Sequence, residues 1–271
     1  DRFVLGGSTV NLCSLDLSKA FDKMNHHALF VKLMKRQFPL EILVVIEKWF
    51  SCCFTCVQWY GVKSTFFSVN IGVRQGGVLS PILFAIYLDD VVKNVCMSQY
   101  GSILSIVLYA DDIILLSPSM IALQNLLRIC EEELIYLDMS INVKKSCSIR
   151  IGPRCNASCE NLSTFEGLKL PWVDEIRYLG IYIIKFRYFK CSLDHAKRSF
   201  YGSANSIFGK IGRIASEEVV LELISKKCLP VLLYGLEVFT LNITEQRSIN
   251  FPFKRLLMKL FKTSSIDNIN D

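Results

Sequence analysis

Residues 105–116 read SIVLYADDIILL, so two adjacent acids, Asp111 and Asp112, lie between two apolar runs. The apolar runs are typical of buried strands, and the polar pair between them predicts a hairpin turn. A turn often contains one Asp, but two carboxylates beside buried strands repel each other and lose hydration. This arrangement costs several kcal/mol per ion unless something neutralises the charges. A divalent cation such as Mg2+, which prefers oxygen ligands, would do so.

A third acid occupies a comparable position. Asp16 follows the apolar run NLCSL at 11–15, which is predicted to be a strand. If this strand lies beside the hairpin, Asp16 meets Asp111, and three acids at strand ends form a site for two metal ions. Such a site stabilises the attacking and the leaving oxygen of a phosphoryl transfer. Paired acids at strand ends also occur as solvated turns, so the spacing alone leaves both interpretations open.

The periodicity of the remaining sequence predicts an α+β fold with two parts. We expect strands over 9–17, 55–60, 64–69, 102–108, 113–117, 146–151 and 178–184, and helices over 23–37, 40–50, 78–95 and 119–137. From Leu193 onward the pattern is mostly helical. The predicted boundary falls near residue 190.

Composition excludes several classes of protein. The 271 residues are 51% hydrophobic and 21% charged, which excludes a disordered or fibrous chain. No uncharged run reaches the roughly 20 residues that a membrane-spanning helix needs, so we expect no membrane partner. The 11 cysteines lie mostly in apolar surroundings, which favours free thiols and an intracellular protein.

Positive charge is concentrated towards the end of the chain. The net charge is +6, of which residues 1–171 carry +1 and residues 172–271 carry +5. An excess of this kind favours a polyanionic partner, although solvated helices are often mildly basic.

Five segments, in order, resemble the motifs of reverse transcriptases. YADD at 109–112 resembles their YxDD box, SLDLSKAFD at 14–22 their first catalytic motif, and GVRQGGVLSP at 72–81 their RQGxxxSP segment. NVKKS at 142–146 is similar to the NxxKT segment and YLG at 178–180 to the YLG segment. Further details are typical of non-LTR (LINE-type) retrotransposon polymerases, namely AFD at 20–22, NHH at 25–27 and LYGLE at 233–237.

The resemblance implies a right-hand polymerase. Residues 1–190 would form the palm, an antiparallel sheet packed on helices, with partial fingers, and residues 191–271 a mostly helical thumb or connection region. The implied reaction is RNA-directed DNA synthesis, which adds dNTPs to a DNA primer 3′-OH on an RNA template. Asp16, Asp111 and Asp112 would hold two Mg2+ ions, or Mn2+, with Asp16 and Asp111 as the principal ligands and Asp112 nearer to the primer end.

The resemblance also implies roles for other residues. The nucleotide and template pocket would be lined by Leu17, Phe21, Arg74, Gln75, Gly76, Gly77, Tyr109 and Ala110. The Phe21 ring would lie under the sugar of the incoming nucleotide and exclude a 2′-hydroxyl. Lys145 is the candidate general acid for the leaving pyrophosphate. The primer grip would be formed by Tyr178, Leu179 and Gly180.

Each of these roles has a structural alternative. Phe21 also suits a core position at a strand–helix junction. The segment 74–77 also suits a glycine-rich helix entry, and Lys145 also suits a solvated surface position. Asp22 suits a helix N-cap. His26 and His27 are expected to be surface residues at a helix start.

Few residues precede the first catalytic motif, so we expect the fingers and the endonuclease of a longer retroelement polyprotein to be missing. We expect the protein in the cytoplasm and nucleus, as part of a ribonucleoprotein. The alternative function is that of a catalytically incomplete remnant that only binds RNA or an RNA–DNA duplex. The same acids would also suit the palm of an RNA-dependent RNA polymerase, or a domain whose acidic turn is simply solvated.

Overall fold

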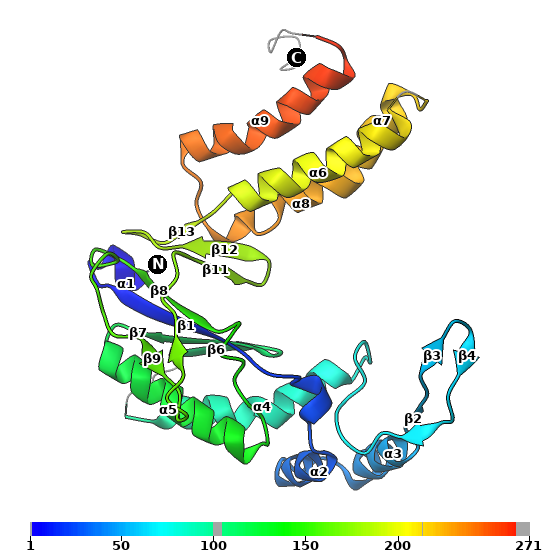
Figure 1. Ribbon diagram of the computed structural model, residues 1–271, viewed down its shortest axis with the longest axis vertical. Helices are drawn as coiled ribbons and strands as arrows, with labels where there is room; N and C mark the ends of the chain where they lie inside the picture. The colour runs from blue at the N-terminus through cyan, green and yellow to red at the C-terminus, as the bar shows by residue number, and fades with distance from the viewer. Residues whose placement is uncertain (1, 100–104, 213, 264–271) are drawn as a thin grey trace. The chain divides into compact units, whose positions relative to one another are not determined.

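The computed structural model describes residues 2–99, 105–212 and 214–263. The chain divides into two compact units (Figure 1). The first comprises Asp1–Ile176 and Lys185–Tyr188, and the second comprises Arg177–Ile184 and Phe189–Asp271.

A four-stranded antiparallel sheet forms the centre of the first unit. Its strand order is β6-β7-β1-β8, where the strands are β6 (Ile106–Tyr109), β7 (Asp112–Ser117), β1 (Val10–Asp16) and β8 (Cys147–Ile151). β1 lies between two strands that come much later in the chain, and Leu12 pairs with Leu116 on one side and Ile149 on the other. Of the strand expected over 102–108, residues 102–104 lie outside the described residues.

Helices cover one face of this sheet (Figure 1). They are α4 (Ser80–Met97) and α5 (Met120–Tyr136), while α2 (His26–Lys35) packs on α4. Cys13 and Leu15 of β1 and Ile113 and Leu115 of β7 belong to the buried core on this side. Because successive strand residues point to opposite faces, the residues between them point to the other face.

Asn25, and not Asp22, is the N-cap of α2. The Asn25 side chain accepts a hydrogen bond from the Ala28 backbone N–H. The prediction for Asp22 was wrong because a short 3-10 turn, η1 (Phe21–Lys23), follows β1 and contains Asp22, so α2 begins only at His26.

The rest of the first unit consists of short elements. They are α1 (Arg2–Leu5), α3 (Leu40–Ser51), β2 (Phe54–Thr55), β3 (Gln58–Trp59), β4 (Val62–Lys63), β5 (Phe67–Ser68), β9 (Leu162–Ser163) and β10 (Lys169–Leu170). β2 pairs with β5 and β3 with β4, so the two strands expected around Gly61 form an interrupted hairpin.

The second unit is mostly helical. Its helical elements are α6 (Asp194–Ile211), α7 (Glu217–Leu223), the π-helical turn η2 (Ile224–Cys228), α8 (Leu229–Leu233), η3 (Leu236–Val238) and α9 (Ile243–Leu260). Phe200 and Ala204 of α6 form its core with Val220, Ile224 and Cys228.

A three-stranded sheet, β11-β12-β13, lies mostly in the second unit, although β11 begins two residues before the boundary at Arg177. Its strands are β11 (Glu175–Tyr178), β12 (Ile181–Ile184) and β13 (Lys190–Cys191). The single strand expected over 178–184 was wrong. Leu179 and Gly180 have φ angles of 46° and 82°, so they form a two-residue turn between β11 and β12.

The predicted fold class is confirmed, since an antiparallel sheet packed on helices is followed by a mostly helical part. Within the described residues, none of the helices has both the length and the apolar character that membrane crossing requires.

Candidate active site

Asp16 and Asp112 lie directly opposite each other in the central sheet. They are partners in the antiparallel register of β1 and β7, and Asp112 is also the partner of Tyr109 in β6. Opposed residues of an antiparallel pair share a face, and their Cβ atoms lie about 4.5–5.5 Å apart. Tyr109, Asp112 and Asp16 therefore form a row on the face away from α4 and α5.

Asp111 lies in the turn beside this row. Ala110 and Asp111 are the two residues that connect Tyr109 to Asp112. The φ angle of Ala110 is 52°, a left-handed conformation that costs a residue with a side chain about 1 kcal/mol or more. The expectation that Asp16 would meet Asp111 needs correction, because the register makes Asp112 its partner.

Charge repulsion and burial act on this cluster. Desolvation raises the pKa of the half-buried Asp112 carboxyl, and the charges of Asp111 and Asp16 raise it further. The Lys145 Nζ atom lies 3.6 Å from Asp16 Oδ2, and the Lys145 side chain is 70% exposed.

Two hydrogen bonds fix the segment that contains Lys145 to the end of β1, and a third closes the segment on itself. The Ser146 hydroxyl accepts from the Asp16 N–H at 3.0 Å and donates to the Asn142 carbonyl at 2.9 Å. The Asn142 N–H donates to the Asp16 carbonyl at 2.8 Å. Sequence reasoning gave Asn142 and Ser146 no role, although both lie in the segment that carries Lys145.

The donor set suits a divalent cation in chemical type. Carboxylate oxygens are the ligands that Mg2+ prefers. The pKa of Asp112 is raised mainly by burial and then by the charges of Asp111 and Asp16, and a cation would offset both effects. Within residues 2–99, 105–212 and 214–263, no three His, Cys, Asp or Glu side chains converge closely enough to hold a metal.

Phe21 links the first catalytic segment to the segment 72–77. Its half-buried ring stacks on the buried Phe84 ring, with centroids 4.4 Å apart. The Phe21 carbonyl accepts from the Val73 N–H at 2.8 Å. A Cβ on Gly72 would lie 2.8 Å from the Asp22 carbonyl oxygen, so this close approach requires glycine.

Arg74 and Gln75 are exposed in the loop before α4. The buried Ser80 hydroxyl donates to the Arg74 carbonyl at 2.6 Å and closes the loop. Gly77 leaves room for that hydroxyl, because a Cβ there would lie 2.6 Å from it. Gly76, in the same loop, has a φ of 81°. Leu17 lies elsewhere, buried in the core beneath the row of acids.

A pocket of about 310 Å3 adjoins this loop. Arg74 and Gln75 line it together with His26, Trp49 and Phe50. The expectation that His26 is a surface residue was wrong, since its Nε2 lies 2.6 Å from the Gly72 carbonyl oxygen and its ring contacts Phe50. His27 is exposed.

Tyr178, Leu179 and Gly180 lie outside the first unit, at the turn between β11 and β12. The sequence-predicted residues thus occur in two groups. The acids, Lys145, Phe21 and 74–77 belong to the first unit, and 178–180 belongs to the second.

Solved structures of telomerase have a similar fold. Apo telomerase from Candida tropicalis is similar with a TM-score of 0.50 and 13% identity, over 96% of this chain and 47% of that one. Telomerase from Candida albicans gives a TM-score of 0.50 and 12% identity, over 95% and 45% of the two chains. At this level of identity, the likeness concerns the fold alone.

The family described as "Reverse transcriptase (RNA-dependent DNA polymerase)" matches residues 6–183. The chain therefore belongs to the reverse transcriptase family, as its motifs predict.

The relatives of this chain come from mobile elements. The RNA-directed DNA polymerase from mobile element jockey of Drosophila funebris is 28% identical over 84% of this chain and 25% of the relative. The Pol polyprotein from type-1 retrotransposable element R2 of Popillia japonica is 28% identical over 84% and 33%. The predicted resemblance to non-LTR retrotransposons is confirmed, and the chain spans between a quarter and a third of these relatives.

Proposed function

We propose that this chain is the catalytic segment of an RNA-directed DNA polymerase, which adds dNTPs to a primer 3′-OH on an RNA template. The observation that carries the proposal is the pairing of Asp16 with Asp112, with Asp111 in the adjoining turn. Asp16 thereby lies at the same end of the sheet as two acids that come much later in the sequence.

Asp16, Asp111 and Asp112 would hold two Mg2+ ions, with Mn2+ as a substitute. When bound, such ions stabilise the charge of the attacking and leaving oxygens. The residues of the chain hold the acids in register: the β1–β7 pairing fixes Asp16 and Asp112, and the strained turn at Ala110 presents Asp111.

Lys145 is proposed to act on the leaving group. Its Nζ carries a proton near Asp16 and can pass it to the leaving pyrophosphate or offset the charge that develops there. The hydrogen bonds of Asn142 and Ser146 to the end of β1 hold this segment at the acids.

The nucleotide and template side is proposed to include Leu17, Phe21, Tyr109, Ala110 and the segment 74–77. Stacking on Phe84 limits movement of the Phe21 ring, which favours its use as a fixed wall beside the sugar. Arg74 is exposed and can pair with a phosphate, and Gln75 can donate to a base or sugar edge.

The second unit is proposed to hold the primer and the duplex. Tyr178, Leu179 and Gly180 would form the primer grip. Basic side chains in or near this unit would contact phosphates, which makes binding salt-dependent; they are Arg187, Lys190, Lys197, Arg198 and Lys210, while Arg213 lies outside the described residues. In this proposal residues 1–190 are palm with partial fingers, and 191–271 are thumb.

The remaining proposals concern the longer protein and its location in the cell. The whole protein would include fingers and an endonuclease and would act in the cytoplasm and nucleus as a ribonucleoprotein. All eleven cysteines are free, which supports an intracellular location.

Primer extension with Mg2+ tests the function. We expect the chain, in its parent protein or with the fingers supplied, to extend a DNA primer on RNA, and Asp111→Asn to lower the rate more than about a hundredfold. Asp138→Asn is the matched control, because Asp138 is exposed and its φ of 57° suits Asn equally well. Equal rates for Asp111→Asn and wild type would exclude the proposed metal site.

Binding without catalysis is the second candidate function. It is favoured by the side-chain positions, since within the described part of the chain no three acidic, His or Cys side chains converge as a metal site does. Salt-sensitive binding of an RNA–DNA duplex by a chain that extends no primer under any divalent ion would support it.

A further inference from the structure

The segment LYGLE at 233–237 contacts the turn between β11 and β12. Tyr234 directly follows α8, and its Oη donates a hydrogen bond to the Leu179 carbonyl at 3.0 Å. All of these residues belong to the second unit.

The contact also depends on two glycines. A Cβ on Gly180 would lie 3.0 Å from Tyr234 Cε1, so the ring rests where a side chain would be. A Cβ on Gly235 would lie 2.6 Å from Ile181 Cδ1, and Gly235 has a φ of 75°. Each segment therefore contributes one glycine that allows the other segment to approach.

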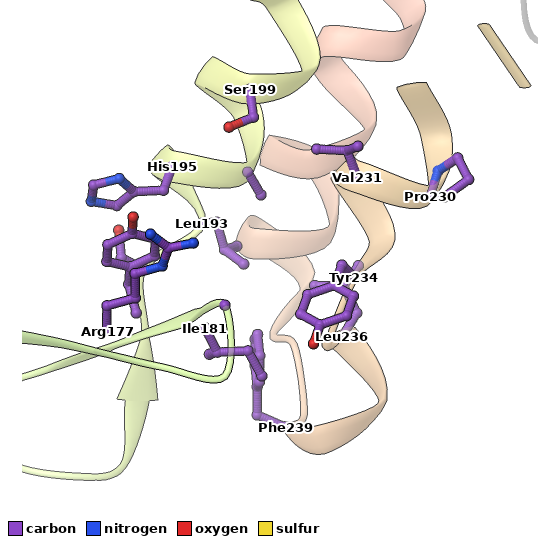
Figure 2. A pocket seen from close by; sticks show the side chains of 14 residues that line it. Arg177, Ile181, Leu193, His195, Ser199, Pro230, Val231, Tyr234, Leu236 and Phe239 are labelled. Atoms are coloured by element: carbon purple, nitrogen blue, oxygen red, sulfur yellow. The ribbon is translucent and has the colours of Figure 1, made fainter. Parts of the chain in front are cut away.

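Together the two segments form part of the wall of a pocket of about 380 Å3 (Figure 2). Figure 2 shows Ile181 from the hairpin and Tyr234 and Leu236 from the segment after α8 among its lining residues. His195 and Ser199 of α6 also line it. The hairpin is thus held against the helices through Tyr234.

The Tyr234 contact contributes little to the hydrophobic core. The Tyr234 side chain is 61% exposed and Leu179 is 37% exposed, so their contact buries little apolar surface. Leu179 has a φ of 46°, which is strained for a residue with a side chain. A hydrogen bond to its carbonyl holds the strained peptide in one orientation.

We propose that Tyr234 is a positioning residue that fixes the Leu179-Gly180 turn and, through it, the primer 3′ end. This inference rests on the proposed function of 178–180 as the primer grip. Tyr234 acts on the turn and not on the reacting atoms.

Hydrogen exchange tests the contact without any need for activity. Tyr234→Phe removes only the hydroxyl, so we expect deuterium uptake by the 177–184 peptide to become about two- to tenfold faster, the range for one net hydrogen bond. Tyr201→Phe makes the same change on α6 and should leave that uptake unchanged. Uptake equal to wild type in Tyr234→Phe would overturn the proposal.

Primer kinetics test the consequence. In the same variant we expect the KM for primer–template to rise about two- to tenfold, while the KM for dNTP and the melting temperature stay as in wild type. Faster exchange with an unchanged primer KM would overturn the positioning role. If the wild-type chain extends no primer even with the fingers supplied, the proposed function fails, while the exchange result still decides whether Tyr234 fixes the turn.

A double-mutant cycle separates the ring from the hydroxyl. Gly180→Ala places a methyl group against the Tyr234 ring, so we expect faster exchange in the hairpin. Tyr234→Leu removes the ring, and in that background the additional effect of Gly180→Ala should be smaller. Additive effects would show that the ring does not constrain the turn and would contradict the proposal.

Discussion

At the scale of single residues, the candidate active site is a place where like charges meet. Desolvation and the charges of Asp111 and Asp16 raise the pKa of the Asp112 carboxyl. Without a cation, this arrangement opposes folding. Ala110, in the adjoining turn, adds backbone strain, and strained residues cluster at functional sites.

Replacement of Ala110 by glycine should stabilise the protein. Glycine adopts the φ of 52° without steric cost, so we expect the free energy of unfolding to rise by about 0.5–1 kcal/mol. Denaturant unfolding measures this change. Ala85→Gly, at an exposed position inside α4, should lower it by about 1 kcal/mol. A lower free energy of unfolding for Ala110→Gly than for wild type would show that the backbone at Ala110 is not strained.

Glu131 provides a pH-dependent test away from the acids. It is buried on α5, and its Oε2 accepts a hydrogen bond from the Phe165 N–H at 2.9 Å. Desolvation raises the pKa of the Glu131 carboxyl, and Glu166 adds to this effect, while the Phe165 N–H opposes it. The folded state holds the proton more tightly than the unfolded state, so stability is lost as the pH rises through the folded-state pKa.

Glu131→Gln should therefore raise the melting temperature at about pH 8 and have little effect at about pH 4. The Gln side chain keeps an oxygen that can accept from the Phe165 N–H. Thermal unfolding at both pH values measures the difference, with the exposed Glu132→Gln as control. An equal shift at both pH values would show that the charge of Glu131 is not the cause.

At the scale of elements, two-residue turns carry residues of the candidate active site and of the proposed primer grip. Ala110-Asp111 joins β6 to β7, and Leu179-Gly180 joins β11 to β12. Sequence periodicity predicted the first hairpin because both strands are long apolar runs. It missed the second because 178–184 is apolar almost throughout, and the positive φ of Leu179 leaves no signal in the residue type.

The sequence alone also could not predict which acid would pair with Asp16 in the sheet. A shift of one residue in β1 against β7 would change which acid faces Asp16, and the alternating pattern does not fix such a shift at a strand end. Similarly, Asp22 and Asn25 both suit an N-cap, and only the η1 turn decides between them.

Helix α9 offers a test of one element. Asn242 and Glu245 form a capping box, in which each side chain accepts from the backbone N–H of the other residue. We expect Asn242→Ala to lower the free energy of unfolding of the second unit by about 1 kcal/mol. Asn250→Ala, an exposed change inside the same helix, should be neutral or slightly stabilising. Equal effects of the two substitutions, measured by denaturant unfolding, would exclude the cap.

At the scale of the whole molecule, the two units have separate cores. Phe84 belongs to one and Phe200 to the other, and none of the residues that the structure describes is shared between them. The sequence predicted an α+β part and a helical part, because long periodic segments are its strongest signal. It did not predict that 185–188 returns to the first unit, since this depends on contacts such as the Gly152 N–H to the Phe186 carbonyl.

Separate cores predict two unfolding transitions. Phe84→Ala should lower the first unit's stability by about 3–5 kcal/mol, and Phe200→Ala should do the same for the second. Calorimetry should show that each substitution shifts one transition and leaves the other in place. A single transition that both substitutions shift equally would contradict this expectation.

The central place of β1 has a consequence for synthesis on the ribosome. β1 emerges first, but its neighbours β7 and β8 are translated only after residues 112 and 147. Pairing over such separations is slow, and an apolar strand without partners is prone to aggregate. β1 thus lacks one of its two partners until Ile151 has left the exit tunnel, and a chain that ends before β7 lacks an acid to pair with Asp16.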